Sequence, residues 1–147
     1  MLQITVPKTE IFNDETGEFT YTKEQKLQLE HSLVSLSKWE SKWCKPFLNS
    51  KDKTEEEILD YVRCMTITQN VPDIVYKVLS SENIKQINDY INAPMTATTF
   101  SDHGGGRSNR EIITSEILYY QMIALNIPFE CRKWHLNRLI TLIRVCS

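Results

Sequence analysis

The chain has 147 residues, hydrophobic side chains make up 41% of it, and its formal net charge is −2. This length suits one domain with a core of its own, and the charge excludes a globally basic nucleic-acid coat. With only four glycines and five prolines, the composition favours helix over an all-β sandwich. No apolar run approaches the roughly 20 residues of a membrane span, and the N-terminus lacks a signal-peptide pattern, so we expect a cytoplasmic protein.

The N-terminal region, residues 1–31, predicts a small β meander that is an appendage and not an independent domain. Hydrophobic and polar residues alternate over residues 2–6, which indicates a strand. Residues 13–17 contain turn formers, and residues 19–22 form a second expected strand. A weaker alternation over residues 26–31 predicts a third strand.

The rest of the chain, residues 32–147, predicts a helical domain of five to six helices, so the fold class is mainly α (α+β). Each expected helix begins at a residue that suits a helix start. These are Ser37 with Glu40 (with Ser32 or Ser35 as rival starts), Thr54 with Glu57, Pro72, Ser80 or Ser81, and Ser108 with Glu111. The second helix is expected to end at Asn70, and the last two helices are expected over residues 109–126 and 129–146.

Helical spacing also predicts which side chains are buried. The second helix should bury Ile58, Tyr61, Val62 and Met65, and the fourth should bury Ile84 together with Ile87. Over residues 109–126 the helical pattern comprises Ile112, Ile113, Glu116, Ile117, Tyr120, Ile123 and Ala124. Because the apolar side chains of 109–126 and 129–146 exceed what one buried face needs, this helical pair is expected to present the surface for self-association or for a partner. The segment 129–146 is apolar over more than half of its face, so it should be buried or cover a partner.

The glycine-rich stretch within residues 95–108 predicts a mobile loop. Its His103-Gly-Gly-Gly run is similar to the oxyanion-hole sequence of lipases, but no G-x-S-x-G nucleophile motif accompanies it. The same glycines precede a helix start, where backbone amides attract anions, but the lysine and spacing of a P-loop are missing. A solvent loop is the better interpretation of both features.

No other pattern indicates catalysis, a cofactor or a metal. The four cysteines have no zinc-ligand spacing and are most simply small buried apolar residues: Cys44, Cys64, Cys131 and Cys146. His31 and His135 are far apart in sequence, and each is expected to be a packed or hydrogen-bonded histidine. An acidic group at the start of the second helix is interpreted as a solvated face that suits the helix dipole: Asp52, Glu55, Glu56, Glu57 and Asp60.

Aromatic and basic residues supply the candidate partner-binding residues. Trp39 and Trp43 are four residues apart on one helical face, so they form either a core anchor or an interface hot spot, and either way should pack with the last helix or in a subunit contact. The C-terminal segment holds Trp134, Arg138 and Arg144, and no acidic residue follows Glu130. These basic residues either complement the helix dipole or bind an acidic partner. Nucleic acid is the weaker alternative because the total charge is negative.

Three stretches, residues 29–43, 94–100 and 127–139, resemble a family of tail assembly chaperones from tailed bacteriophages and prophages. The resemblance implies a mostly helical, non-enzymatic protein in the cytoplasm of the bacterial host. It also implies that the chain oligomerises and binds the tape measure protein and other tail proteins, which it keeps from aggregating. No catalytic, cofactor-binding or metal-binding residue is carried over. A structural virion component, such as a head–tail connector or tail completion protein, is the main alternative, and a nucleic-acid-binding regulator is a weaker one.

Overall fold

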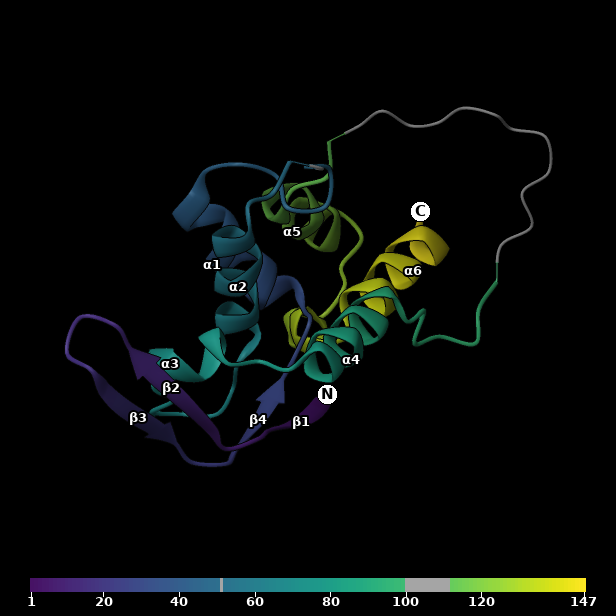
Figure 1. The fold of residues 1–147 in the computed structure, drawn as a ribbon. Helices are drawn as coiled ribbons and strands as arrows, with labels where there is room; N and C mark the ends of the chain where they lie inside the picture. The colour runs from purple at the N-terminus through teal and green to yellow at the C-terminus, as the bar shows by residue number, and fades with distance from the viewer. Residues whose placement is uncertain (51, 100–111) are drawn as a thin grey trace.

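The computed structural model describes residues 1–50, 52–99 and 112–147, and it is mainly helical with a small N-terminal β element (Figure 1). The strands are β1 (Leu2–Val6), β2 (Thr9–Asn13), β3 (Glu18–Thr22) and β4 (Gln25–Leu29). The helices are α1 (Leu33–Trp43), α2 (Glu55–Met65), α3 (Asp73–Lys77), α4 (Ser81–Asn92), α5 (Ser115–Ala124), the 3₁₀ turn η1 (Phe129–Lys133) and α6 (Leu136–Cys146). The predicted fold class is confirmed. The predicted loop at 101–108 and the predicted cap at Ser108 lie outside the described residues.

The four strands form two nested antiparallel hairpins. β1 pairs with β4, and β2 pairs with β3 beyond them. The predicted turn at residues 13–17 is confirmed: Gly17 adopts φ +68° and its amide donates to the carbonyl of Asn13 at 2.8 Å. The sequence predicted three strands and missed β2, whose alternation is weak because most of its side chains face solvent.

The inner hairpin belongs to the main core. Buried side chains of β1, β4, α1, α2, α3 and α4 form one cluster, to which Ile4, Val6, Leu27 and Leu29 contribute. The chain after α2 also extends this sheet, because the amide of Ile67 donates to the carbonyl of Gln28 at 2.8 Å. The N-terminal appendage is therefore anchored through β1 and β4, and only the β2–β3 hairpin extends beyond the body (Figure 1).

A second cluster joins the start of α1 to the C-terminal helices. Leu33 and Leu36 pack there with Leu118 and Met122 of α5 and Leu139 of α6, all of them essentially inaccessible to solvent. Trp39 belongs to the first cluster instead, where it contacts α2. Of the two alternatives for Trp39 and Trp43, packing with the last helix is wrong within the described residues, and a subunit contact stays a prediction.

The predicted helix starts at Thr54 and Ser80 are confirmed, whereas the first helix begins at the rival start Ser32 and not at Ser37, which lies inside α1. Each of the three cap side chains accepts a hydrogen bond from a backbone amide of the first turn. Several ends differ. α2 stops at Met65, before the expected Asn70, because the chain turns there to run beside β4. Pro72 is the cap of α3 and not its first residue.

The two C-terminal helices are shorter than predicted. α5 begins at Ser115, so residues 112–114 are not helical, and the segment 129–146 divides into η1 and α6 at the extended residues Trp134 and His135. The break has a tertiary cause: the amide of Leu136 donates to the carbonyl of His31 at 2.8 Å, a bond that a continuous helix would exclude.

Burial differs from the predicted pattern at several positions. Ile58 and Ile84 are exposed, as are Cys44 and Cys146, so only Cys131 is a fully buried cysteine. Glu57 and Asp60, expected on a solvated face, are buried. Ion pairing explains this reversal, because Lys45 pairs with Glu57, and Lys42 and Arg63 pair with Asp60. In the described part of the chain, no helix is long and apolar enough to cross a membrane.

Candidate protein-binding surface

Helix α5 is apolar on two opposite sides, and only one side is covered. Leu118 and Met122 pack into the second cluster. Ile117, Tyr120 and Ile123 lie on the outer side and are 39%, 68% and 61% exposed. These outer residues belong to the helical pattern predicted over residues 109–126, which was expected to present a binding surface, and that expectation stays a prediction. The periodicity of α5 cannot distinguish the sides because both carry large hydrophobic residues.

The buried side of α5 is fixed by a carboxylate of α1. Glu40 accepts from the amide of Ser115 at 2.7 Å and from the amide of Phe47 at 3.0 Å. The cap residue Thr114 makes no side-chain hydrogen bond, so Glu40 satisfies the first free amide of the helix and places negative charge at its positive end. The outer face of α5 is thereby presented in one orientation.

A groove continues this face between α5 and α6. It has a volume of about 480 Å³, and Ile117, Leu125, Ile140 and Ile143 are among the residues that line it. Among the described residues that line it, Arg144 is the one that carries a charge. Such a groove is apolar, open and lined by branched side chains, and this is the character of surfaces that bind amphipathic helices.

Of the predicted partner-binding residues, the structure brings Trp134 and Arg138 together. The guanidinium of Arg138 lies 4.3 Å from the centre of the Trp134 ring, a cation–π contact. Both line a second hollow of about 440 Å³, with Met95, Leu142 and Val145. Arg138 and Arg144 line different hollows, so the predicted single basic surface is divided over two sides of α6.

The other two predicted residues belong to the interior. Trp39 is fully buried, and its indole donates to the carbonyl of Glu57 at 2.8 Å. Trp43 is partly buried, and its indole donates to Asp60 at 2.8 Å. Burial alone would raise the pKa of Asp60, but hydrogen bonds from Lys42, Trp43 and Arg63 outweigh it and hold the pKa below its ordinary value. These tryptophans therefore join α1 to α2.

The β2–β3 hairpin, which we call the arm, carries an aromatic face that the sequence did not predict. Phe12 lies opposite Phe19, and Glu10 lies opposite Tyr21, so these four side chains share one face of the ribbon. The two phenylalanine rings are 5.0 Å apart, and Phe12, Phe19 and Tyr21 are 50%, 55% and 72% exposed. Register produces this face, which is why neither strand alone indicated it.

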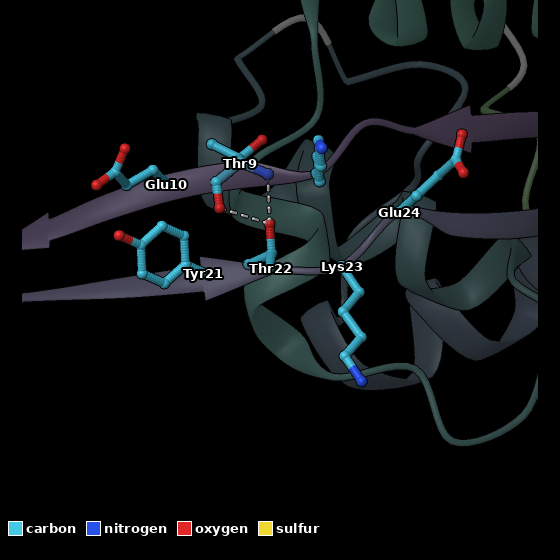
Figure 2. Close-up of a pocket in the computed structure, with 7 residues that line it drawn as sticks. Thr9, Glu10, Tyr21, Thr22, Lys23 and Glu24 are labelled. Atoms are coloured by element: carbon cyan, nitrogen blue, oxygen red, sulfur yellow. Dashed lines mark hydrogen bonds between the residues drawn. The ribbon is translucent and has the colours of Figure 1, made fainter.

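The base of the arm is fixed by a threonine pair. Figure 2 shows the two hydrogen bonds, in which the Thr9 amide donates to Thr22 Oγ1 at 3.0 Å and this hydroxyl donates to the Thr9 carbonyl at 3.1 Å. A shallow hollow of about 550 Å³ lies here, and Tyr21 and Lys23 are among the residues that line it. Thr22 is the one buried residue of the arm, so the rest of the ribbon has no cover in the described structure.

The fold also brings together the two histidines that are distant in sequence. Their rings lie 5.2 Å apart, and both residues are buried. His31 Nδ1 bonds to the Tyr61 hydroxyl, which also bonds to Ser35. Burial, and second the neighbouring His135, lower the pKa of His31 to about 3.

Hydrogen bonds fix the tautomer of His135. Its Nδ1 accepts from the amide of Asn137 at 3.2 Å, so Nε2 carries the proton and donates to the carbonyl of Tyr90 at 2.7 Å. Burial lowers the pKa of His135. The prediction of packed, hydrogen-bonded histidines is confirmed. The pair is a structural joint between the start of α1, α2, α4 and the start of α6.

Across residues 1–50, 52–99 and 112–147, no group of three or more His, Cys, Asp or Glu side chains is arranged to hold a metal ion. In comparisons with known proteins, no family model, no curated protein and no solved structure matches this chain. The case for a functional site therefore depends on the exposed surfaces of α5, α6 and the arm.

Proposed function

We propose that this protein is a tail assembly chaperone of a tailed bacteriophage or prophage, which binds the tape measure protein through the outer face of α5 and the adjoining groove. The observation that carries this proposal is the uncovered apolar side of α5. The resemblance of three sequence stretches to the chaperone family gives the partner.

The physical basis of this proposal is that the chaperone covers apolar helix surface of its client that would otherwise be exposed to water. A tape measure protein is a long helical chain, and apolar stripes on such a chain aggregate if they stay exposed to water. An amphipathic helix of the client would place its stripe on Ile117, Tyr120 and Ile123. Each 100 Å² of apolar area removed from water contributes about 2.5 kcal/mol before the costs of association.

The test is co-expression of the chain with the tape measure protein, with the soluble fraction of the tape measure protein as the measurement. We expect Tyr120→Gln/Ile123→Gln to lower that fraction to the level found without the chaperone. The matched control is Ile58→Gln/Ile84→Gln. It removes two other exposed isoleucines, 47% and 45% exposed, from α2 and α4. All four positions are exposed, so each variant should keep its stability within about 0.5 kcal/mol.

Two results would contradict the proposal. One is a Tyr120→Gln/Ile123→Gln variant that folds and solubilises the tape measure protein as well as the parent. The other is the presence of many copies of the chain in purified virions, measured by mass spectrometry. That second result would favour the alternative of a structural virion component.

A further inference from the structure

The arm and the hollow beside Trp134 have complementary charge. Residues 9–22 contain four acidic side chains and no lysine or arginine: Glu10, Asp14, Glu15 and Glu18. Residues 131–147 contain four basic side chains and no acid, and of these Arg138 lines the hollow: Arg132, Lys133, Arg138 and Arg144. None of the ion pairs within the described residues involves an acid of the arm or Arg138.

The two surfaces also match in their apolar parts. The arm offers Phe12, Phe19 and Tyr21 on one face. The hollow on α6 offers the Trp134 ring together with Met95 and Val145, which are 46% and 57% exposed. The aromatic face of the arm, with acidic residues at its end, therefore complements the hollow, which has an aromatic ring and a cation in its wall. Within the described structure, no other segment covers either surface.

The arm cannot reach the hollow of its own chain. β1 and β4 bury Ile4, Val6, Leu27 and Leu29 in the main core, and this anchors the base of the arm. Figure 1 shows the β2–β3 ribbon on one side of the molecule and α6 on the other. Contact between the two surfaces therefore requires two copies of the chain.

We infer that the aromatic face of the arm in one copy docks into the Trp134–Arg138 hollow of a second copy. The two surfaces differ, so the contact is heterologous, and each copy retains one free arm or one free hollow for the next. The product is a head-to-tail series that closes into a ring or continues as a filament. The contact area that a single arm can bury is smaller than that of a standard protein interface. The contact is therefore weak, and the fraction of associated chains depends on protein concentration. This inference does not depend on the proposed client surface on α5.

Two variants at exposed positions test the inference. Phe12→Thr/Phe19→Thr removes the aromatic rings of the arm and keeps residues that favour strands. Arg138→Glu/Val145→Gln reverses the charge of the hollow and removes an exposed valine. Lys133→Glu is the matched control, because this exposed cation does not line the hollow. Light scattering after size exclusion, over a range of concentrations, gives the mass of each species.

We expect the parent and Lys133→Glu to associate, and each double variant to raise the dissociation constant at least about tenfold. The decisive measurement is the mixture of the two double variants. A heterologous contact predicts one-to-one pairs that grow no further, because the intact arm of one variant fits the intact hollow of the other. A third variant, Asp14→Lys/Glu15→Lys, changes only turn side chains and should also weaken association, more at low salt than at high salt.

Three outcomes would overturn the inference. The parent could remain monomeric at every concentration. Both double variants could associate like the parent. The mixture could stay monomeric although each variant is folded by circular dichroism, which would show that both variants damage one symmetric interface. None of these outcomes changes capture of the tape measure protein by α5, so the two proposals fail separately.

Discussion

Acidification should destabilise the protein through its buried histidines. In the folded chain the pKa of His31 is about 3, because burial and His135 disfavour the charged ring. In the unfolded chain the pKa is about 6.5. Between these values the unfolded state binds more protons than the folded state, so stability is fully present above pH 6.5 and is lost as the pH falls towards 3.

The magnitude follows from the difference between the two pKa values. Each unit corresponds to 1.36 kcal/mol, so lowering the pH from 7.5 to 5 should cost about 2 kcal/mol from His31 alone. The pKa of His135 is lowered as well, so its contribution has the same sign. The pKa of Asp60 is held below its ordinary value, so this buried carboxylate stays ionised over the range from pH 7.5 to 5.

The assay is urea unfolding at pH 7.5, 6 and 5. A loss of about 2 kcal/mol shifts the midpoint by about 1 M urea. His31→Asn is the matched variant, because its amide can replace Nδ1 as the partner of Tyr61 and does not titrate. It should lose less stability than the parent over the same pH range. Equal stability of the parent at pH 7.5 and pH 5, or a His31 resonance that titrates near pH 6.5, would refute the reasoning.

Three further predictions concern stability and reactivity. Trp39→Ala should lower the free energy of unfolding by about 3–5 kcal/mol, and Trp43→Ala by less, because Trp39 is fully buried and Trp43 only partly; equal losses would contradict this. Glu40→Gln should cost about 1–3 kcal/mol in thermal or urea unfolding, because one of its two amide donors loses its acceptor, whereas Glu116→Gln at the exposed start of α5 should change little. A thiol-specific reagent should modify Cys44 and Cys146 quickly and Cys64 and Cys131 slowly, since burial raises the pKa of the latter two thiols and limits access; four equal rates would be inconsistent with the fold.

Residues close in sequence predicted most helix starts, but they did not predict every buried face. Ser32, Thr54 and Ser80 cap helices because capping depends on residues within one turn. The exposed and buried sides of α5 could not be assigned, because its sequence is apolar all round and the choice depends on packing against Leu33 and Leu36.

Features that depend on contacts distant in sequence were not predictable. The break at Trp134 and His135 depends on a hydrogen bond to His31, more than 100 positions earlier. The aromatic face of the arm depends on the register that places Phe12 opposite Phe19. The C-terminal hollow was anticipated in part, because the sequence predicted Trp134 and Arg138 as partner-binding residues and the fold places them in contact.

The two proposed surfaces would act together on a long client. In a head-to-tail series, each copy presents the outer face of α5 in the same orientation relative to its neighbour, because Glu40 and the Leu118–Met122 side fix that helix to the body. A client with a repeated apolar stripe then binds several copies, and each further contact becomes intramolecular, with a high effective concentration. A modest affinity at every α5 face is therefore sufficient for stable cover of the whole client.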